Sequence, residues 1–205
     1  MINLNQYPIF QNHWSSLKET SKDNRDGKVV YMTESNYPVI NFDEVKEEYM
    51  KALALCELPK SNDALFYEGD KIWVFVEFKN ARVSKTLQYE LRKKIYDSVL
   101  IFTDITSTGI SFMRNHMKYI LVYNEEANKD NSQDLNLIKK QSEFVQQSKA
   151  YDDLAKTIMN YGKNEIICFG LKIFLNYCFK EVHTFTKHEF EQYLSIIGYK
   201  DNTSF

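Results

Sequence analysis

The sequence predicts an α/β fold built as a single domain. Apolar residues recur at helical spacing over residues 42–56 and 84–102, and apolar runs typical of strands occupy residues 63–68, 72–79 and 118–123. Helices that alternate with strands along the chain are typical of α/β proteins. The 205 residues include only 6 Gly and 3 Pro but 14 Tyr and 14 Phe, a balance that indicates long elements around a well-filled core.

The N-terminal part of the chain precedes the first predicted strand and helix. The first 26 residues are polar, and they end in a turn signal that runs from Asp23 to Gly27. Residues 28–32 then form a short predicted strand. The helix over 42–56 carries acidic residues in its first turn and is stopped by Pro59.

The remaining elements follow in an order that defines a core and an extension. Residues 63–68 and 72–79 form a predicted hairpin around Gly69-Asp70, and a long helix over 84–102 comes next. We then expect a loop at 106–109, a strand at 118–123, a polar loop at 124–134, a solvent-facing helix or helix pair at 135–161, and one or two strands within 165–185. Thr186 and Glu189 fit a capping box that begins a final helix. The single domain 1–205 thus divides into a core at about 28–125 and a C-terminal extension at about 135–205.

Composition narrows the class of protein. The net charge is −2, and 43% hydrophobic with 26% charged residues is ordinary for a globular chain, which excludes disordered and fibrous classes. The three cysteines are an odd number without a C-x-x-C pair, so they indicate neither a disulfide framework nor a thiolate metal site. We find no signal-peptide pattern and no apolar run near the roughly 20 residues that span a bilayer. A cytoplasmic protein without membrane contact is expected.

The strand at 72–79 carries the most informative side chains. One of its faces is apolar throughout, whereas the other begins with Trp73 and Phe75 and then turns charged at Glu77 and Lys79. Apolar residues on both faces predict a central strand that is covered on both sides. Desolvating a carboxylate and an ammonium at the end of such a strand is costly, so we expect these two residues to have partners or a function.

The partner of Glu77 depends on the hairpin register. If residues 69–71 form a three-residue loop, Glu68 pairs with Ile72 and Asp63 lies opposite Glu77. A two-residue loop instead pairs Asp63 with Val76 and turns Asp63 to the other face. Opposed carboxylates repel one another unless a cation lies between them, and two carboxylates suit Mg²⁺ or Mn²⁺. Only the first register therefore predicts a metal site, at which Lys79 would orient or help deprotonate the attacking water or neutralise charge on a phosphate.

Asp63, followed fourteen residues later by Glu77-x-Lys79 at the end of an apolar strand, resembles the PD-(D/E)XK nuclease superfamily, whose fold is restriction-endonuclease-like. The superfamily orders a helix, three antiparallel strands, a helix and a strand, and the resemblance implies this order over residues 42–123. It also implies Asp63 and Glu77 as metal ligands and Lys79 as the catalytic lysine. Many members add a glutamate from the preceding helix, for which Glu48 is the candidate, although Glu48 also fits a solvated helix position. Asn62-Asp63 stands where the superfamily usually has Pro-Asp.

A basic stretch adds a separate indication of a phosphate ligand. Residues 79–94 contain six basic residues and one acidic residue, an excess of +5 in a chain of net charge −2. The side chains expected to contact substrate are Lys94, Arg82, Lys85 and Ser98, of which Lys94 and Ser98 flank the apolar stripe of their helix.

The leading hypothesis is a Mg²⁺- or Mn²⁺-dependent nuclease that acts on DNA, and a homodimer is compatible with it. The first alternative is a catalytically inactive protein of the same fold that serves as an interaction or regulatory module. The second is a non-enzymatic immunity or toxin-neutralising protein of α/β type.

Overall fold

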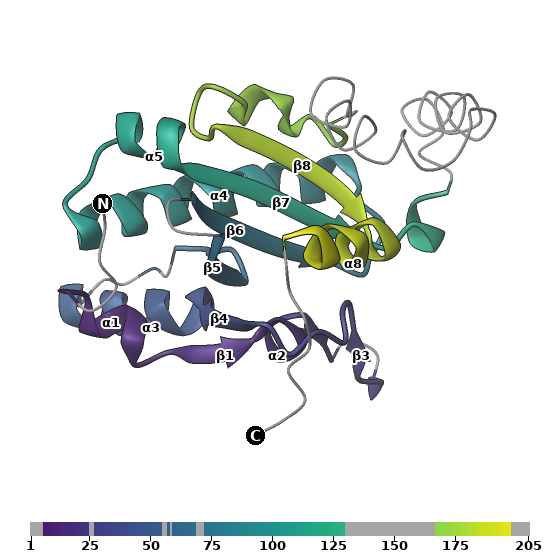
Figure 1. The fold of residues 1–205 in the computed structure, drawn as a ribbon, viewed down its shortest axis with the longest axis horizontal. Helices are drawn as coiled ribbons and strands as arrows, with labels where there is room; N and C mark the ends of the chain where they lie inside the picture. Colours follow the sequence, from purple (N-terminus) through teal and green to yellow (C-terminus); the bar gives the residue numbers. More distant parts are fainter. Residues whose placement is uncertain are drawn as a thin grey trace.

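A computed structural model of the chain describes residues 6–24, 27–54, 57, 59–68, 72–129 and 167–197. Its centre is a six-stranded mixed sheet with the strand order β1-β4-β5-β6-β7-β8 (Figure 1). These strands are β1 (Trp14–Ser16), β4 (Pro38–Asn41), β5 (Ala64–Glu68), β6 (Ile72–Lys79), β7 (Met117–Tyr123) and β8 (Glu181–Thr186). A separate two-stranded sheet pairs β2 (Lys22–Asp23) with β3 (Val30–Tyr31). The structure is therefore of the α/β class.

Strand directions divide the main sheet into two halves. β1, β4, β5 and β6 are antiparallel neighbours, whereas β6, β7 and β8 run parallel. The β6–β7 connection contains the helices α4 (Lys85–Thr106) and α5 (Ile110–His116), because parallel strands need a crossover. β6 lies between β5 and β7, and its residues from Trp73 to Phe78 are all buried. The prediction of a central strand covered on both sides is confirmed.

Two apolar cores fill the space on either side of the sheet. One contains Trp73 and Phe75 of β6 and packs against α3 (Phe42–Leu53), α4 and α5. The other contains Val74 and Val76 and packs against α2 (Leu17–Thr20) and α8 (Lys187–Ile196), so that α4 and α8 cover opposite faces in Figure 1. The remaining short helices are α1 (Pro8–Gln11), η3 (Glu126–Asn128) and η4 (Leu171–Phe174). Period-two alternation thus sends successive β6 side chains into different cores.

The long elements lie close to where the sequence predicts them. α3 begins at Phe42, α4 begins one residue after its predicted start, and both hairpin strands are present. The Thr186 hydroxyl accepts a hydrogen bond from the Glu189 N–H and the Glu189 carboxylate accepts one from the Thr186 N–H, so the predicted capping box is confirmed. α4 extends to Thr106, beyond its predicted end at residue 102.

The N-terminal segment, which precedes the predicted core at about 28–125, is part of the same fold. This segment contributes α1, α2, β1 and β2, and its residues Phe10 and Leu17 are fully buried, one in each core. Its apolar residues are too sparse along the chain to form a helical or strand pattern of their own. They become core residues only because the sheet supplies their neighbours.

The predicted order of helix, three antiparallel strands, helix and strand over residues 42–123 is also wrong. Only β5 and β6 lie between α3 and α4, and the third antiparallel strand, β4, comes before α3. β4 has only four residues, which is too short for period-two alternation to be recognised. A restriction-endonuclease-like core is therefore not confirmed.

The C-terminal part joins the same sheet. β8 pairs in parallel with β7, from Lys118 with Glu181 to Tyr123 with Thr186. The helix predicted over 135–161 lies outside the described residues, as do residues 130–134 of the predicted polar loop at 124–134. Within the described part of that loop, the buried Asn128 side chain bonds the Val83 N–H and the Ala81 and Asn124 carbonyls, which ties the end of β6 to the end of β7. None of the helices in the described ranges is long and apolar enough to cross a membrane.

Candidate functional site

The β5–β6 register brings Asp63 next to Glu77. Glu68 pairs with Ile72 and Ala64 pairs with Val76, and Asp63 and Glu77 are the residues that come next beyond this last pair. Of the two registers that the sequence allows, the one that predicts a metal site is confirmed. The Asp63 N–H donates to the Val76 carbonyl at 3.1 Å, and the Asp63 Oδ2 accepts the Phe78 N–H at 2.7 Å. Both bonds fix the Asp63 side chain at the end of the hairpin.

Lys94 of α4 lies between the two carboxylates. Its Nζ contacts Glu77 Oε1 at 2.7 Å, Glu77 Oε2 at 2.9 Å and Asp63 Oδ1 at 3.1 Å. An ammonium has three donors, so these contacts use all of them. Lys79 Nζ lies 2.5 Å from the same Glu77 Oε1. The two carboxylates therefore share one cation and are further neutralised by a second.

Burial removes the charged groups of this network from water, which costs free energy unless they pair with one another. The Glu77 side chain is completely buried, and those of Lys79 and Lys94 are only 14% and 18% exposed. Burial and the neighbouring Glu77 charge raise the pKa of Asp63, against the opposing effect of Lys94 and Lys79. Burial by itself lowers the pKa of Lys94, but the Glu77 and Asp63 carboxylates outweigh it and raise this pKa above its ordinary value. Because the two carboxylates hold the Lys94 ammonium in its charged form, it counts as a full positive charge in the network.

One face of α4 holds the segment that carries Asp63. The Lys60 N–H donates to Asp97 Oδ2 and the Asn62 N–H donates to Ser98 Oγ, each at 2.8 Å. Positions 94, 97 and 98 share a helical face because they are three and four residues apart. The helix thus fixes residues 60–63 with the same face that places Lys94.

Ser98→Ala tests this attachment. We expect the substitution to lower the free energy of unfolding by about 1–3 kcal/mol, because it leaves the buried Asn62 N–H without an acceptor. Urea unfolding monitored by circular dichroism measures the loss, with the exposed Ser111→Ala as the control. Equal stability of the two variants would mean that Ser98 does not hold the segment.

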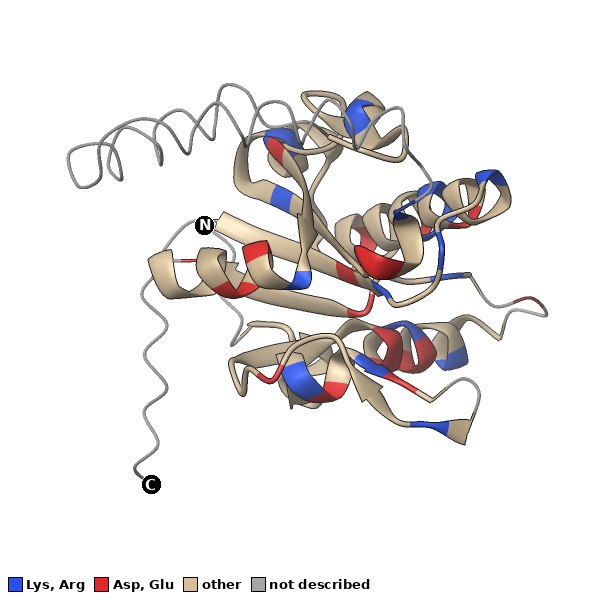
Figure 2. Cartoon of the chain, turned by 90° about the vertical axis from the view of Figure 1, so that its right-hand side faces the viewer, with Lys and Arg blue, Asp and Glu red and all other residues tan. Residues whose placement is uncertain are grey.

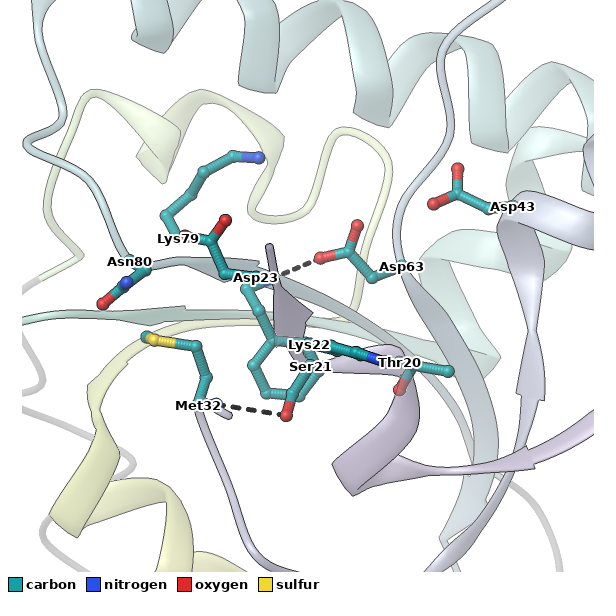
Figure 3. Close-up of a pocket in the computed structure, with 10 residues that line it drawn as sticks. Thr20, Ser21, Lys22, Asp23, Met32, Asp43, Asp63, Lys79 and Asn80 are labelled. Carbon is teal, nitrogen blue, oxygen red and sulfur yellow. Dashed lines mark hydrogen bonds between the residues drawn. The ribbon is translucent and has the colours of Figure 1, made fainter. Parts of the chain in front are cut away.

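A polar pocket of about 180 Å³ opens beside this network. Asp43 at the start of α3, Asp63 and Lys79 all line it, and in Figure 3 their charged ends lie on the same side of the β6 backbone. The other lining residues are Thr20, Ser21, Lys22, Asp23, Met32, Phe78 and Asn80. Residues 20–23 and Met32 form part of its wall, although no sequence pattern marks them as functional. They take part because α2 and β2 fold against the end of β6.

The structure brings Asp43, and not Glu48, to the pocket. Glu48 Oε2 lies 2.7 Å from His13 Nε2, and His13 also contacts Glu44. Asp43 accepts a hydrogen bond from the Ser61 hydroxyl and lies 3.4 Å from the Lys46 ammonium. Glu48 was the candidate from the sequence because it flanks the apolar stripe of α3. Asp43 lies at the pocket because the Phe42 N–H donates to the Asp63 carbonyl at 3.2 Å, which brings the first turn of α3 to Asp63.

The predicted substrate-contacting residues have different surroundings. Lys94 is engaged with the carboxylates, and Ser98 is completely buried and bonded to the main chain. Arg82 and Lys85 are exposed just after Asn80, which lines the pocket. Lys79 and Lys94, two of the six basic residues within 79–94, form internal ion pairs. The positive charge that this segment presents to a ligand is therefore smaller than the excess of +5 counted from the sequence. Figure 2 accordingly shows acidic and basic residues interspersed on the helices.

Within the described part of the chain, no three His, Cys, Asp or Glu side chains are gathered closely enough to form a metal site by themselves. The arrangement consists of two carboxylates around a lysine, with two further carboxylates, Asp23 and Asp43, lining the adjoining pocket. No protein-family model, no curated protein and no solved structure matches the chain.

Proposed function

We propose that the protein is a metal-dependent nuclease that hydrolyses phosphodiester bonds, with DNA as the substrate. The observation that carries the proposal is the convergence of the Asp63 and Glu77 carboxylates on one cationic nitrogen, beside Lys79 and a polar pocket. Two carboxylate oxygens that contact the same nitrogen at 3.1 and 2.7 Å are close enough to share one cation. The short distance between the Asp63 and Glu77 oxygens supports the proposal that they bind one metal ion.

The donor set fits Mg²⁺ or Mn²⁺. Both ions prefer carboxylate oxygens, and Asp63 and Glu77 would supply them, with Asp43 as the third candidate from the pocket side. A bound ion would supply Lewis-acid polarisation of the phosphate and a more acidic water. The ligand set proposed here thus replaces Glu48 with Asp43.

Lys79 and the start of α4 support the phosphodiester part of the proposal. The Lys79 ammonium lies at the carboxylate pair and lines the pocket, where it would orient the attacking water and offset the negative charge that develops on the phosphate. Arg82 and Lys85 are exposed a few residues further along and would contact the nucleic-acid backbone.

One observation favours a catalytically inactive interaction module as the second candidate. Lys79 and Lys94 already neutralise Asp63 and Glu77, so the network is balanced without a metal ion. In that case the four residues are a structural ion-pair cluster, and the protein has no cleavage activity.

Nicking of supercoiled plasmid DNA separates the two candidates. With Mg²⁺ or Mn²⁺, we expect the wild type to nick the plasmid and EDTA to stop it. Lys79→Ala is expected to reduce the rate by about 100- to 1,000-fold, because it removes a charge placed to stabilise the transition state. Lys172→Ala, which removes an exposed lysine of η4, is the matched control. An RNA of the same sequence tests the choice of substrate.

Two results would contradict the proposal. If the purified wild type nicks neither substrate with either metal, the inactive module becomes the better account. If Lys79→Ala and the wild type nick at the same rate, the activity does not arise from this site.

A further inference from the structure

The Lys94 ammonium and a divalent cation would compete for the same oxygen atoms. Glu77 Oε1 contacts both Lys79 and Lys94, which fills the two lone pairs of a carboxylate oxygen. Glu77 Oε2 and Asp63 Oδ1 each accept from Lys94, while Asp63 Oδ2 accepts the Phe78 N–H. Each of the four carboxylate oxygens is therefore already engaged by a donor from the chain.

Sharing the site is excluded by distance and charge. The Lys94 nitrogen lies 2.7–3.1 Å from three oxygens of the pair, whereas Mg²⁺ must approach its ligands to about 2.0–2.1 Å. A divalent ion at these oxygens would thus lie within a few ångströms of the ammonium. Like charges at such a short distance repel strongly at the reduced effective dielectric constant near a protein surface.

We propose that Lys94 is a built-in competitor of the metal, so that a divalent ion binds to Asp63 and Glu77 only as the Lys94 side chain leaves them. This inference rests on the proposed function, because it concerns the same site, and it adds a control on when the site is loaded. The protein without metal is self-neutralised by Lys94. The metal concentration needed for loading is consequently higher than the two carboxylates alone would require.

The Lys94 side chain can leave the two carboxylates. Its side chain is 18% exposed and belongs to α4, a different element from the strand that carries Glu77. Rotation about its side-chain bonds can therefore release the ammonium toward solvent while the backbones of α4 and β6 stay in place. Lys79 is attached to the same strand as Glu77, two residues away, and keeps its contact.

The first experiment measures Mn²⁺ binding without nucleic acid. In titrations followed by the electron paramagnetic resonance of free Mn²⁺, Lys94→Met is expected to bind Mn²⁺ at least about tenfold more tightly than the wild type, because it removes the competing charge. Lys93→Met is the matched control, since Lys93 is the exposed neighbour on the same helix, and it should bind as the wild type does. Equal Mn²⁺ affinities in all three proteins would contradict the competition between Lys94 and the metal, but they would not contradict the metal site itself.

A second measurement uses the wild type, in case Lys94→Met does not fold. Amine-reactive labelling read by mass spectrometry reports how accessible each lysine is. Mn²⁺ is expected to increase labelling of Lys94 severalfold and to leave Lys93 unchanged. If Mn²⁺ binds but Lys94 labelling stays constant, the exchange is wrong. If no protein binds Mn²⁺ at millimolar concentration, both this inference and the proposed metal-dependent function fail.

Discussion

Glu77→Gln is expected to lower the free energy of unfolding by about 3–5 kcal/mol, because it leaves two lysines in a buried site without their main counter-charge. The Glu77 side chain is completely buried and contacts both ammonium groups, and Asp63 contacts only one of them. Urea unfolding followed by fluorescence measures the change, since the fully buried Trp73 on the same strand becomes exposed on unfolding. Glu47→Gln, an exposed position on α3, is the control.

A double variant identifies the cause of this loss. Adding Lys94→Gln to Glu77→Gln removes one of the stranded charges, so the combined loss should be smaller than the sum of the two single losses. A loss of less than about 1 kcal/mol in Glu77→Gln would contradict the prediction, because that is the value of a solvated surface ion pair.

Asp63→Asn is expected to reduce metal-dependent cleavage of DNA by about 1,000-fold or more. A Lewis-acid ion contributes several kcal/mol to transition-state stabilisation, and each 1.4 kcal/mol corresponds to a factor of ten in rate. The amide keeps one oxygen that can accept the Phe78 N–H, so the hairpin should stay intact. Initial rates at saturating Mn²⁺ measure the effect, with an unfolding curve to show that the variant is folded.

The same assay decides which residue of α3 completes the metal site. Asp43→Asn should weaken Mn²⁺ binding and slow cleavage, because Asp43 lines the pocket together with Asp63 and Lys79. Glu47→Gln again serves as the control. If Glu48→Gln slows cleavage and Asp43→Asn does not, Glu48 is the ligand after all, and its contact with His13 must break when metal binds.

Sequence patterns predicted the elements with strong periodicity and missed those without it. The two long helices and the hairpin were predictable because each carries its own apolar stripe or alternation, and Thr186 with Glu189 marked the start of α8. β1 and β4 have three and four residues, which is too few for a recognisable period. They are strands only because neighbouring strands complete their hydrogen bonds.

The candidate site shows the same division. Asp63, Glu77 and Lys79 were predictable because hairpin register and the period of a strand place side chains over short sequence distances. The role of Lys94 as the shared cation was not, because it depends on how α4 lies on the sheet. The position of Asp43, rather than Glu48, at the pocket was also not predictable, because it follows from a main-chain hydrogen bond between Phe42 and Asp63.

By itself the sequence determined the α/β class and the central strand that carries Glu77 and Lys79, and it limited the position of Asp63 to two hairpin registers. Tertiary structure alone decided which cation lies between those carboxylates, which acidic residue of α3 faces the pocket, and that residues 20–23 form its wall. The physical reason is range: periodicity and register act between residues a few positions apart. Charge pairing and pocket formation join residues from β2, α3, β6 and α4, which meet only after the sheet and its helices have packed.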